Sequence, residues 1–554
     1  MTRMKRRAIG VLVAASATAG ILWVAVGSAS TVDSLTPVPA ANTKSVGSAP
    51  PTLLSPQLAQ IVWAQGSYKL ENGTPAIPFY GYYGDGPMFP ASGAVQSPGH
   101  NVEASKSEPD KNTYLRLHGQ VGADPNYNYG THFLFQGHEL VGSGATGYIT
   151  RINLDADGPH RVTLLATKDD QGKGLPPIDG STWDPWAGKL LFSSEAGNKG
   201  GVWQASPGFP SQVQDISGAL GRGGYEGLQN DSDGNVWVVE DVGGKAGTTN
   251  GHAKQANSFI YRFKPYHPGD LTQGKLQVLQ ATSLRNGQPI AFHDGQVDQD
   301  ILSGDAQDLH TYGHTFATKW VTVHDTKTDG TTPFDANAAA KLKSATPFKR
   351  PENGQFRPGS DFREFYFDET GDTNAQTEAG ADFGGFGGVQ KLTQSNPSAD
   401  TGTLTLFYQG NVGHTGFDNV AFFSGRKVAF VEDRGDTLHT QTVLDSGFLF
   451  DTNADYSSAS TPAPVRFLAQ GRDPSATIDS GLFSASGTGF QNEGDNEITG
   501  IHVSDGNPGP NGILGAQIPK PFQRDRHDRN RWRAFYTQQH GDNPTYELIA
   551  SPSR

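Results

Sequence analysis

The chain has 554 residues, of which 70 are glycine, 35 are proline and none is cysteine. Its formal charge at pH 7 is −13, and a surface of this sign repels nucleic acid while it favours hard cations. The absence of cysteine excludes disulfide bonds and thiolate metal sites, and the acidic balance argues against nucleic acid as a partner.

The first thirty residues have the layout of an export segment. Four cationic side chains within residues 1–7 precede an uncharged stretch over 8–27, and small residues follow over 27–30. This order is typical of a secretory signal. The uncharged stretch also approaches the roughly 20 residues that span a bilayer, so an uncleaved membrane anchor is the alternative. In both cases we expect an exported protein, secreted or held at the outer face of the membrane.

Two further regions follow the export segment. Residues 31–55 are rich in Pro, Ser, Thr and Ala, a composition typical of a disordered linker. Residues 56–554 contain no low-complexity break, and β architectures often remain one domain at such lengths. We therefore predict a single large domain over 56–554 with a substantial core.

Short runs of β-branched and aromatic residues, separated by Gly, Asp and Asn, recur along this domain and predict an all-β fold with tight turns. The helical prediction is limited to 337–342, and the polar stretch 243–344 is predicted as a long loop insertion. The clearest predicted strands are 189–192, 235–239, 365–367, 404–408 and 427–431.

Three pairs of predicted strands share a loose repeat. Each copy has an acid, an apolar strand, a glycine turn, a second apolar strand and another acid. Such recurrence in an all-β chain is typical of the inner strands of a β-propeller, and we expect six blades with long loop insertions. Two packed β-sandwiches would give similar strands without the repeated acids. The copies begin at Asp179, Tyr225 and Phe417.

The repeated acids predict a metal site. Equivalent strand ends of a propeller meet around one channel, and crowded carboxylates repel unless a cation lies among them. Oxygen ligands select hard ions, of which Ca²⁺ is the default outside the cell. Acids beside glycine also cap turns, but glutamate is a poor turn residue, which favours the metal. The repeated glutamates are Glu195, Glu226, Glu240 and Glu432, and similar positions beside other strands hold Glu139, Glu352 and Glu497.

Several short segments, in the same order along the chain, resemble the PhoX-type secreted alkaline phosphatases. The resemblance implies a propeller whose channel holds several Ca²⁺ ions and, in these phosphatases, a pair of iron ions, and in which phosphate monoesters are hydrolysed. The similar segments are 103–115, 137–139, 191–195, 221–226, 349–353, 430–433, 496–500 and 537–541. His540, in the last of them, is either a ligand, an acid–base group or a structural histidine.

The same resemblance implies roles for single residues. Arg350 matches the arginine of an Arg-Pro-Glu motif that contacts the phosphate. Ser194 stands where the family has an iron-binding cysteine, and Gly137 replaces an asparagine on the phosphate side. The loss of the thiolate weighs against iron, so the expected site is either all-calcium or differently metallated, with activity that is weaker or directed elsewhere. The implied metal ligands are Glu139, Glu195, Glu226, Glu352, Glu432 and Glu497.

The sequence therefore predicts a metal-dependent phosphatase that hydrolyses small-molecule phosphate monoesters in a carboxylate-lined channel. Two alternatives stay open. One is another Ca²⁺-dependent propeller hydrolase, such as a lactonase, and the other is a non-catalytic, calcium-stabilised propeller that binds a surface partner. Arg350 discriminates between them, because a phosphatase needs an anion-binding cation in the channel and a structural calcium site does not.

Overall fold

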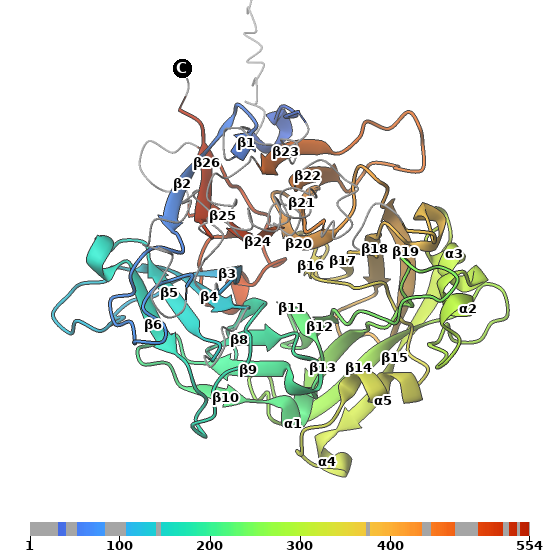
Figure 1. Cartoon of the computed structure of the whole chain (residues 1–554), viewed down its shortest axis with the longest axis horizontal. Helices are drawn as coiled ribbons and strands as arrows, with labels where there is room; N and C mark the ends of the chain where they lie inside the picture. Colours follow the sequence, from blue (N-terminus) through green and yellow to red (C-terminus); the bar gives the residue numbers. More distant parts are fainter. Residues whose placement is uncertain are drawn as a thin grey trace, which may run out of the picture.

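In the computed structural model, strands dominate and form five antiparallel sheets set radially around a central axis (Figure 1). No helix in the part of the chain that is described reaches the length and apolarity of a membrane span. The predicted export segment 1–30 and His540 lie outside the described residues. The structure describes residues 31–39, 52–82, 107–139, 146–372, 377–434, 445–470, 497–523, 531–539 and 543–552.

The sheets follow the chain order around the axis. The first contains β3 (Pro109–Arg116), β4 (His132–His138), β5 (Ile149–Asn153) and β6 (Val162–Ala166). The second contains β7 (Ser181–Asp184), β8 (Lys189–Ser194), β9 (Gly201–Ala205) and β10 (Val213–Asp215). The third has nine strands, in the order β11 (Tyr225–Asn230), β12 (Val236–Glu240), β13 (Ile260–Pro265), β14 (Gly274–Ala281), β15 (Phe316–Asp325), β19 (Thr401–Gln409), β18 (Gly388–Gln394), β17 (Glu364–Glu369) and β16 (Gly354–Phe356).

Two sheets near the C-terminus each take an N-terminal strand as their outermost member. The fourth sheet contains β20 (Phe417–Phe422), β21 (Lys427–Glu432), β22 (Ser446–Asp451), β23 (Val465–Gln470) and β1 (Thr52–Leu54). The fifth contains β24 (Glu497–Ser504), β25 (Arg533–Gln539), β26 (Thr545–Ala550) and β2 (Leu58–Ala64). Pairing of β2 with β26 therefore joins the beginning of the chain to its end.

One end strand of each sheet lies at the axis, and the nine-stranded sheet contributes both of its ends. Side chains at equivalent ends of these strands are thereby brought into one channel, which is the arrangement of a propeller. The all-β prediction is confirmed, and all five predicted strands lie on observed strands. The axial strands contact one another in the cyclic order β3, β7, β11, β16, β20, β24.

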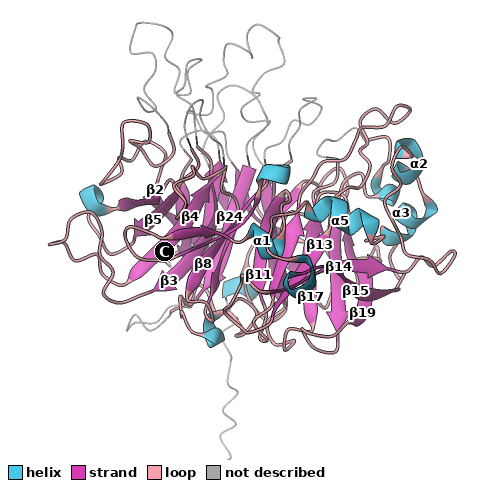
Figure 2. Cartoon of the chain, turned by 90° about the horizontal axis from the view of Figure 1, so that it is seen from below, coloured by secondary structure: helices cyan, strands magenta, loops and turns pink. Residues whose placement is uncertain are grey.

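The prediction of a loop over 243–344 is wrong for much of that stretch, because it contains β13, β14 and β15. The polar turn residues between these strands obscured their pattern, although β15 alternates between buried and exposed positions over its first half. The segments that join and follow these strands contain short helices, one of which is the predicted helix. Figure 2 shows α2, α3 and α5 on one face of the molecule. The helices in this stretch are α2 (Val297–Ile301), α3 (Gly304–Leu309), α4 (Thr326–Asp329) and α5 (Ala336–Leu342), and α1 (Ser217–Leu220) precedes them.

Two pieces of the stretch predicted as a linker, 31–55, pack on the domain. A 3-10 turn (Thr31–Ser34) places Val32 and Leu35 in a buried cluster with residues of the fourth and fifth sheets, and β1 pairs with β23. Composition alone concealed this packing, since the few apolar residues among Pro, Ser and Thr are the ones that dock.

Replacement of Leu35 by alanine tests this packing. Leu35 is 7% exposed, so we expect the free energy of unfolding to fall by about 2 kcal/mol, measured by urea denaturation. Leu342→Ala is the matched control, because Leu342 is 86% exposed. Equal stability of the two variants would show that residues 31–39 are not part of the folded unit.

Candidate metal centre

Four axial strands carry the same β-bulge beside the channel; in β24 it begins with Gly500, and in the other three it begins with an acid. In β3, β11 and β20 the pairing with the next strand shifts by one residue, between Pro109 and Asn112 in the first case and at the equivalent positions in the others. A bulge of this kind re-aims the side chains of the longer strand. We call the three acids that begin these bulges the bulge acids: Asp110, Glu226 and Asp418.

The second strand of each of these three hairpins supplies another acid. His138, Glu240 and Glu432 pair with the residue before each bulge and end their strands. Side chains of successive strand residues point to opposite faces, so the residue after each strand end is the one directed at the channel. These channel-facing residues are Glu139, Asp241 and Asp433.

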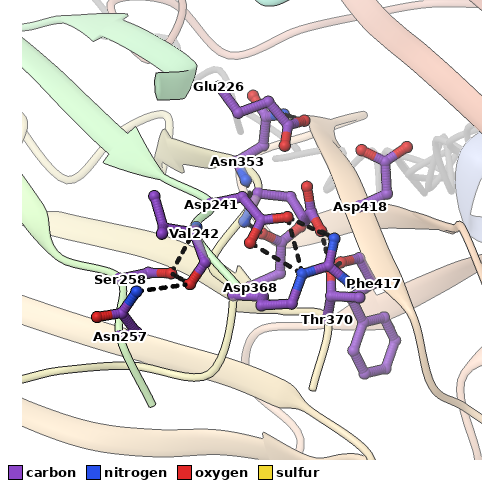
Figure 3. Close-up of polar contacts among 12 residues, drawn as sticks. Glu226, Asp241, Val242, Asn257, Ser258, Asn353, Asp368, Thr370, Phe417 and Asp418 are labelled. Carbon is purple, nitrogen blue, oxygen red and sulfur yellow. Dashed lines mark hydrogen bonds and ion pairs between the residues drawn. The ribbon is translucent and has the colours of Figure 1, made fainter. Parts of the chain in front are cut away.

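The acids form three overlapping groups in which one carboxylate oxygen of each member lies within 4.8 Å of the others. Figure 3 shows Glu226 and Asp418, from different sheets, facing the same central space. Because Glu226, Asp179 and Glu195 are shared between groups, the set is continuous. The groups are Glu195, Glu226, Asp241 and Glu352; Asp110, Asp179 and Glu226; and Glu139, Asp179 and Glu195.

Burial and mutual repulsion both oppose ionisation of this set. Burial raises the pKa of Glu195 well above its ordinary value, and Asp241 and Glu352 raise it further. Burial likewise raises the pKa of Glu226, and Glu352 and Asp179 add to the effect. A divalent cation among the carboxylates would remove this cost.

The donor set fits a hard cation. All the candidate ligand atoms in these groups are carboxylate oxygens, which hard cations such as Ca²⁺ prefer, and Oδ1 of Asp179 is buried without a hydrogen-bond partner in the described residues. Of the glutamates predicted as ligands, the structure brings four into the groups: Glu139, Glu195, Glu226 and Glu352. After burial, the charges of Asp418, Asp433, Glu139 and Asp110 raise the pKa of Glu497. Since Glu139 and Asp110 belong to the groups, Glu497 lies near them.

Glu432, also predicted as a ligand, lies outside these groups. It accepts hydrogen bonds from the backbone N–H groups of Ser446, at 3.0 Å, and Thr415, at 3.3 Å, and burial raises its pKa to about 7. Its position therefore holds β21 to its neighbours, and Asp433 faces the channel instead. Glu432 ends β21, and Asp433 is the next residue of the chain.

Glu240, which the internal repeat predicts as a metal ligand, occupies the equivalent place in β12. Its carboxylate accepts from the backbone N–H of Phe259, the Tyr261 hydroxyl and the Asn337 amide, each at 3.1 Å. Burial raises its pKa to about 8. Like Glu432, it stabilises the contact between strands, while Asp241 joins a candidate metal group.

Arg350 lies at the edge of the largest group. Its Nε donates to both carboxylate oxygens of Asp241 at 2.9 Å, and Nη2 lies 3.3 Å from Oε1 of Glu352. Burial disfavours the charged form, but Asp241 and Glu352 outweigh this and raise the pKa of Arg350. The backbone φ of Arg350 is 55°, a left-handed conformation that costs a non-glycine residue about 1–3 kcal/mol, and the N–H of Thr370 holds the Arg350 carbonyl at 2.8 Å.

Gly227, the second residue of the β11 bulge, leaves room for a close backbone approach. A Cβ atom there would lie 2.8 Å from the Glu352 carbonyl oxygen and 2.9 Å from the Cα of Asn353. The Asn353 amide donates to Oε1 of Glu226 at 3.0 Å. A side chain at Gly227 would therefore displace two residues of the candidate centre.

Replacement of Gly227 by alanine should lower the free energy of unfolding by about 2 kcal/mol through overpacking and weaken the binding of a metal ion at the candidate centre. Thermal unfolding and calorimetric titration with Ca²⁺ would measure the two effects. Gly208→Ala is the control, because no atom lies within 4 Å of a Cβ at Gly208. If the Gly227→Ala protein is destabilised but binds Ca²⁺ with wild-type affinity, the close approach at Gly227 has no role in metal binding.

Several members of the centre could not be chosen from local sequence. Asp179 begins a repeat but was not predicted as a ligand, and Asp241 was passed over for its neighbour. Asp110 belongs to a segment that resembles the phosphatase family, yet its direction depends on a bulge. Alignment of the three hairpins with one another places Asp110 beside Glu226 and Asp241 beside Glu139, whereas Asp179 lies outside these hairpins.

Comparison with known proteins supports the fold. PhoX from Pseudomonas fluorescens, in complex with vanadate, a transition state analogue, matches over 93% of this chain and 98% of its own, with a TM-score of 0.54 and 11% identity. The chain thus has a PhoX-like fold at low identity, which confirms the resemblance at that level. No family model and no curated protein matches the sequence.

Two further structures match less closely. The soluble aldose sugar dehydrogenase from Escherichia coli, in the apo-form, matches 68% of this chain and 96% of its own, with a TM-score of 0.28 and 11% identity. Sqt1 from Chaetomium thermophilum, bound to the N-terminus of the ribosomal protein L10, matches 82% and 98%, with a TM-score of 0.30 and 9% identity.

Proposed function

We propose that this chain, whose fold is PhoX-like, is an exported, metal-dependent phosphatase that hydrolyses small phosphate monoesters in its channel. The observation that carries the proposal is the placement of Arg350 against a buried group of four carboxylates. Carboxylates alone suit a structural ion, whereas a guanidinium beside them also suits a substrate anion.

We further propose six blades, each starting at one axial strand, with two blades joined in the nine-stranded sheet through β15 and β19.

The metal would be held by Glu195, Glu226, Asp241 and Glu352, with Asp179 and Glu139 as further ligands. Ca²⁺ is the ion we propose, because the donors are oxygens and the chain has no cysteine. A bound ion would polarise a phosphoryl oxygen and lower the pKa of coordinated water.

Arg350 would bind the phosphate. Its Nε and Nη2 contact Asp241 and Glu352, and Nη1 has no hydrogen-bond partner in the described part of the chain. The planar guanidinium can therefore keep its contact with Asp241 while Nη1 donates to a phosphate oxygen. Asp241 orients the guanidinium of Arg350 through its hydrogen bonds, and the left-handed backbone conformation at Arg350 determines the direction in which the side chain leaves the backbone.

Hydrolysis of p-nitrophenyl phosphate by the purified full chain tests the function. We expect turnover that a chelator removes, that Ca²⁺ restores and that vanadate inhibits. Absence of chelator-sensitive turnover with Ca²⁺ or iron would contradict the phosphatase. Chelator-sensitive hydrolysis of a lactone without phosphatase activity would support the lactonase alternative. Absence of both activities would favour the non-catalytic propeller that binds a surface partner.

A further inference from the structure

A lysine is buried among the acids of the channel. Lys111 is 4% exposed and follows Asp110 in the β3 bulge. Its ammonium group donates a hydrogen bond to Oδ1 of Asn353. Burial lowers the pKa of Lys111, and four carboxylates oppose this effect. In order of decreasing influence they are Asp418, Asp110, Glu226 and Asp368.

The bulges explain how this cation reaches its place. The residue after the bulge acid is Lys111 in β3, Gly227 in β11 and Asn419 in β20. One of the three bulges thus carries a long cationic side chain, and the carboxylates that act on it include the acids of all three. One lysine side chain, from β3, therefore interacts electrostatically with carboxylates from three different sheets.

Two of these carboxylates have an oxygen that nothing else compensates. Oδ2 of Asp368 and Oδ2 of Asp418 are buried and lack a hydrogen-bond partner in the described residues. Burial of an unpaired carboxylate oxygen is costly. The charge of Lys111 counteracts the rise that burial causes in the pKa of Asp368, and Asp418 is the carboxylate that acts most strongly on Lys111.

Lys111 also acts on Glu226 through Asn353. The Asn353 side chain accepts from Lys111 with Oδ1 and donates from Nδ2 to Oε1 of Glu226 at 3.0 Å. Its backbone N–H donates to Oδ1 of Asp368 at 2.7 Å. Because an amide has its donor and acceptor on opposite sides, the lysine determines which side of Asn353 faces Glu226.

We propose that Lys111 is a tethered cation that takes the place of a metal ion among the bulge acids, and that it is a positioning residue for Glu226 through Asn353. The second part rests on the proposed function, in which Glu226 is a metal ligand. The first part concerns charge balance in the metal-free protein and is independent of any activity.

The charge balance is tested in the chelator-treated full chain with Lys111→Met, Asp418→Asn and the double variant. Lys111→Met should lower the Tm clearly, because it removes the charge at nearly constant volume. Asp418→Asn should then restore part of the loss, since it removes one uncompensated carboxylate. Lys319→Met is the control, because Lys319 lies exposed on β15. Additive effects in the double variant, or a Lys111→Met protein as stable as the control, would overturn the proposal.

If Lys111→Met does not fold without metal, folding of the double variant still supports the proposal, and failure of both counts against it. Ion content gives a second readout. In the presence of Ca²⁺, Lys111→Met should bind about one ion more per chain than the wild type, while Lys111→Arg should match the wild type. If folded Lys111→Met binds the same number of ions as the wild type, Lys111 does not take the place of an ion. A wild type that binds no Ca²⁺ would contradict the proposed function but not the charge balance.

Discussion

Arg350→Met is expected to abolish phosphate binding and to lower the free energy of unfolding of the metal-free protein by about 3–5 kcal/mol. The guanidinium is the partner of the buried Asp241 carboxylate and lies 3.3 Å from Glu352. Its loss leaves two acids uncompensated and removes the donor proposed for the phosphate. Urea denaturation and calorimetric titration with vanadate would measure the two effects.

The matched control is Arg363→Met. Arg363 forms a surface ion pair with Asp361 at 3.5 Å, and its side chain is 56% exposed, so its loss should change stability by less than about 1 kcal/mol. Excess Ca²⁺ should recover most of the stability of Arg350→Met but none of its vanadate binding. Retained vanadate affinity in that variant would remove Arg350 from the substrate site. Charge reversal to glutamate is a poorer test, because it adds a carboxylate to the group.

The metal-free protein should become less stable as the pH rises from about 6.5 to 8. This window lies above the range in which buried His414 and His502, whose pKa values burial lowers to about 4 and about 3, oppose the trend. Burial raises the pKa of Glu432 from 4.5 to about 7 and that of Glu240 from 4.5 to about 8. A carboxyl group with a raised pKa in the folded state binds more protons there than in the unfolded chain, so stability falls with pH between the two values. For Glu432 the difference corresponds to about 3 kcal/mol.

Urea denaturation at several pH values, with chelator and with Ca²⁺, would measure this dependence. Ca²⁺ should reduce the part that arises from the metal groups but not the part from Glu432 and Glu240, which lie outside them. Glu432→Gln should flatten the remaining slope, whereas Glu364→Gln, at a half-buried ion pair with Arg357, should not. Stability of the metal-free protein that rises over this range would contradict the assignment.

Local patterns predicted the elements well. The strands at 189–192 and 427–431 could be located because β-branched and aromatic runs between turn residues are a property of consecutive residues. The same reasoning failed over 243–344, where helices and polar turns separate the strands, and over 31–55, where a few apolar residues dock among many polar ones. In both cases the missing information was the surface against which the segment packs.

The candidate ligands show the limit more sharply. The repeat predicts Glu195, Glu226 and Glu432 alike, whereas the structure brings Glu195 and Glu226 into one candidate group and leaves Glu432 outside it. A shift of one residue along a strand moves a side chain to the other face, and the bulges that direct Asp110 and Glu226 depend on pairing between strands. No local pattern distinguishes a glutamate that ends a strand from one that enters a channel.

The sequence by itself determined the chemistry that is available: an all-β chain rich in carboxylates and without thiolate, hence oxygen donors for a hard cation. The tertiary structure alone decided which carboxylates meet, that Arg350 is paired with Asp241, and that Lys111 lies among the bulge acids. The reason is physical. Residue types fix what a side chain can bind, whereas its direction follows from strand register, from bulges and from contacts between residues hundreds of positions apart, such as Lys111 and Asn353.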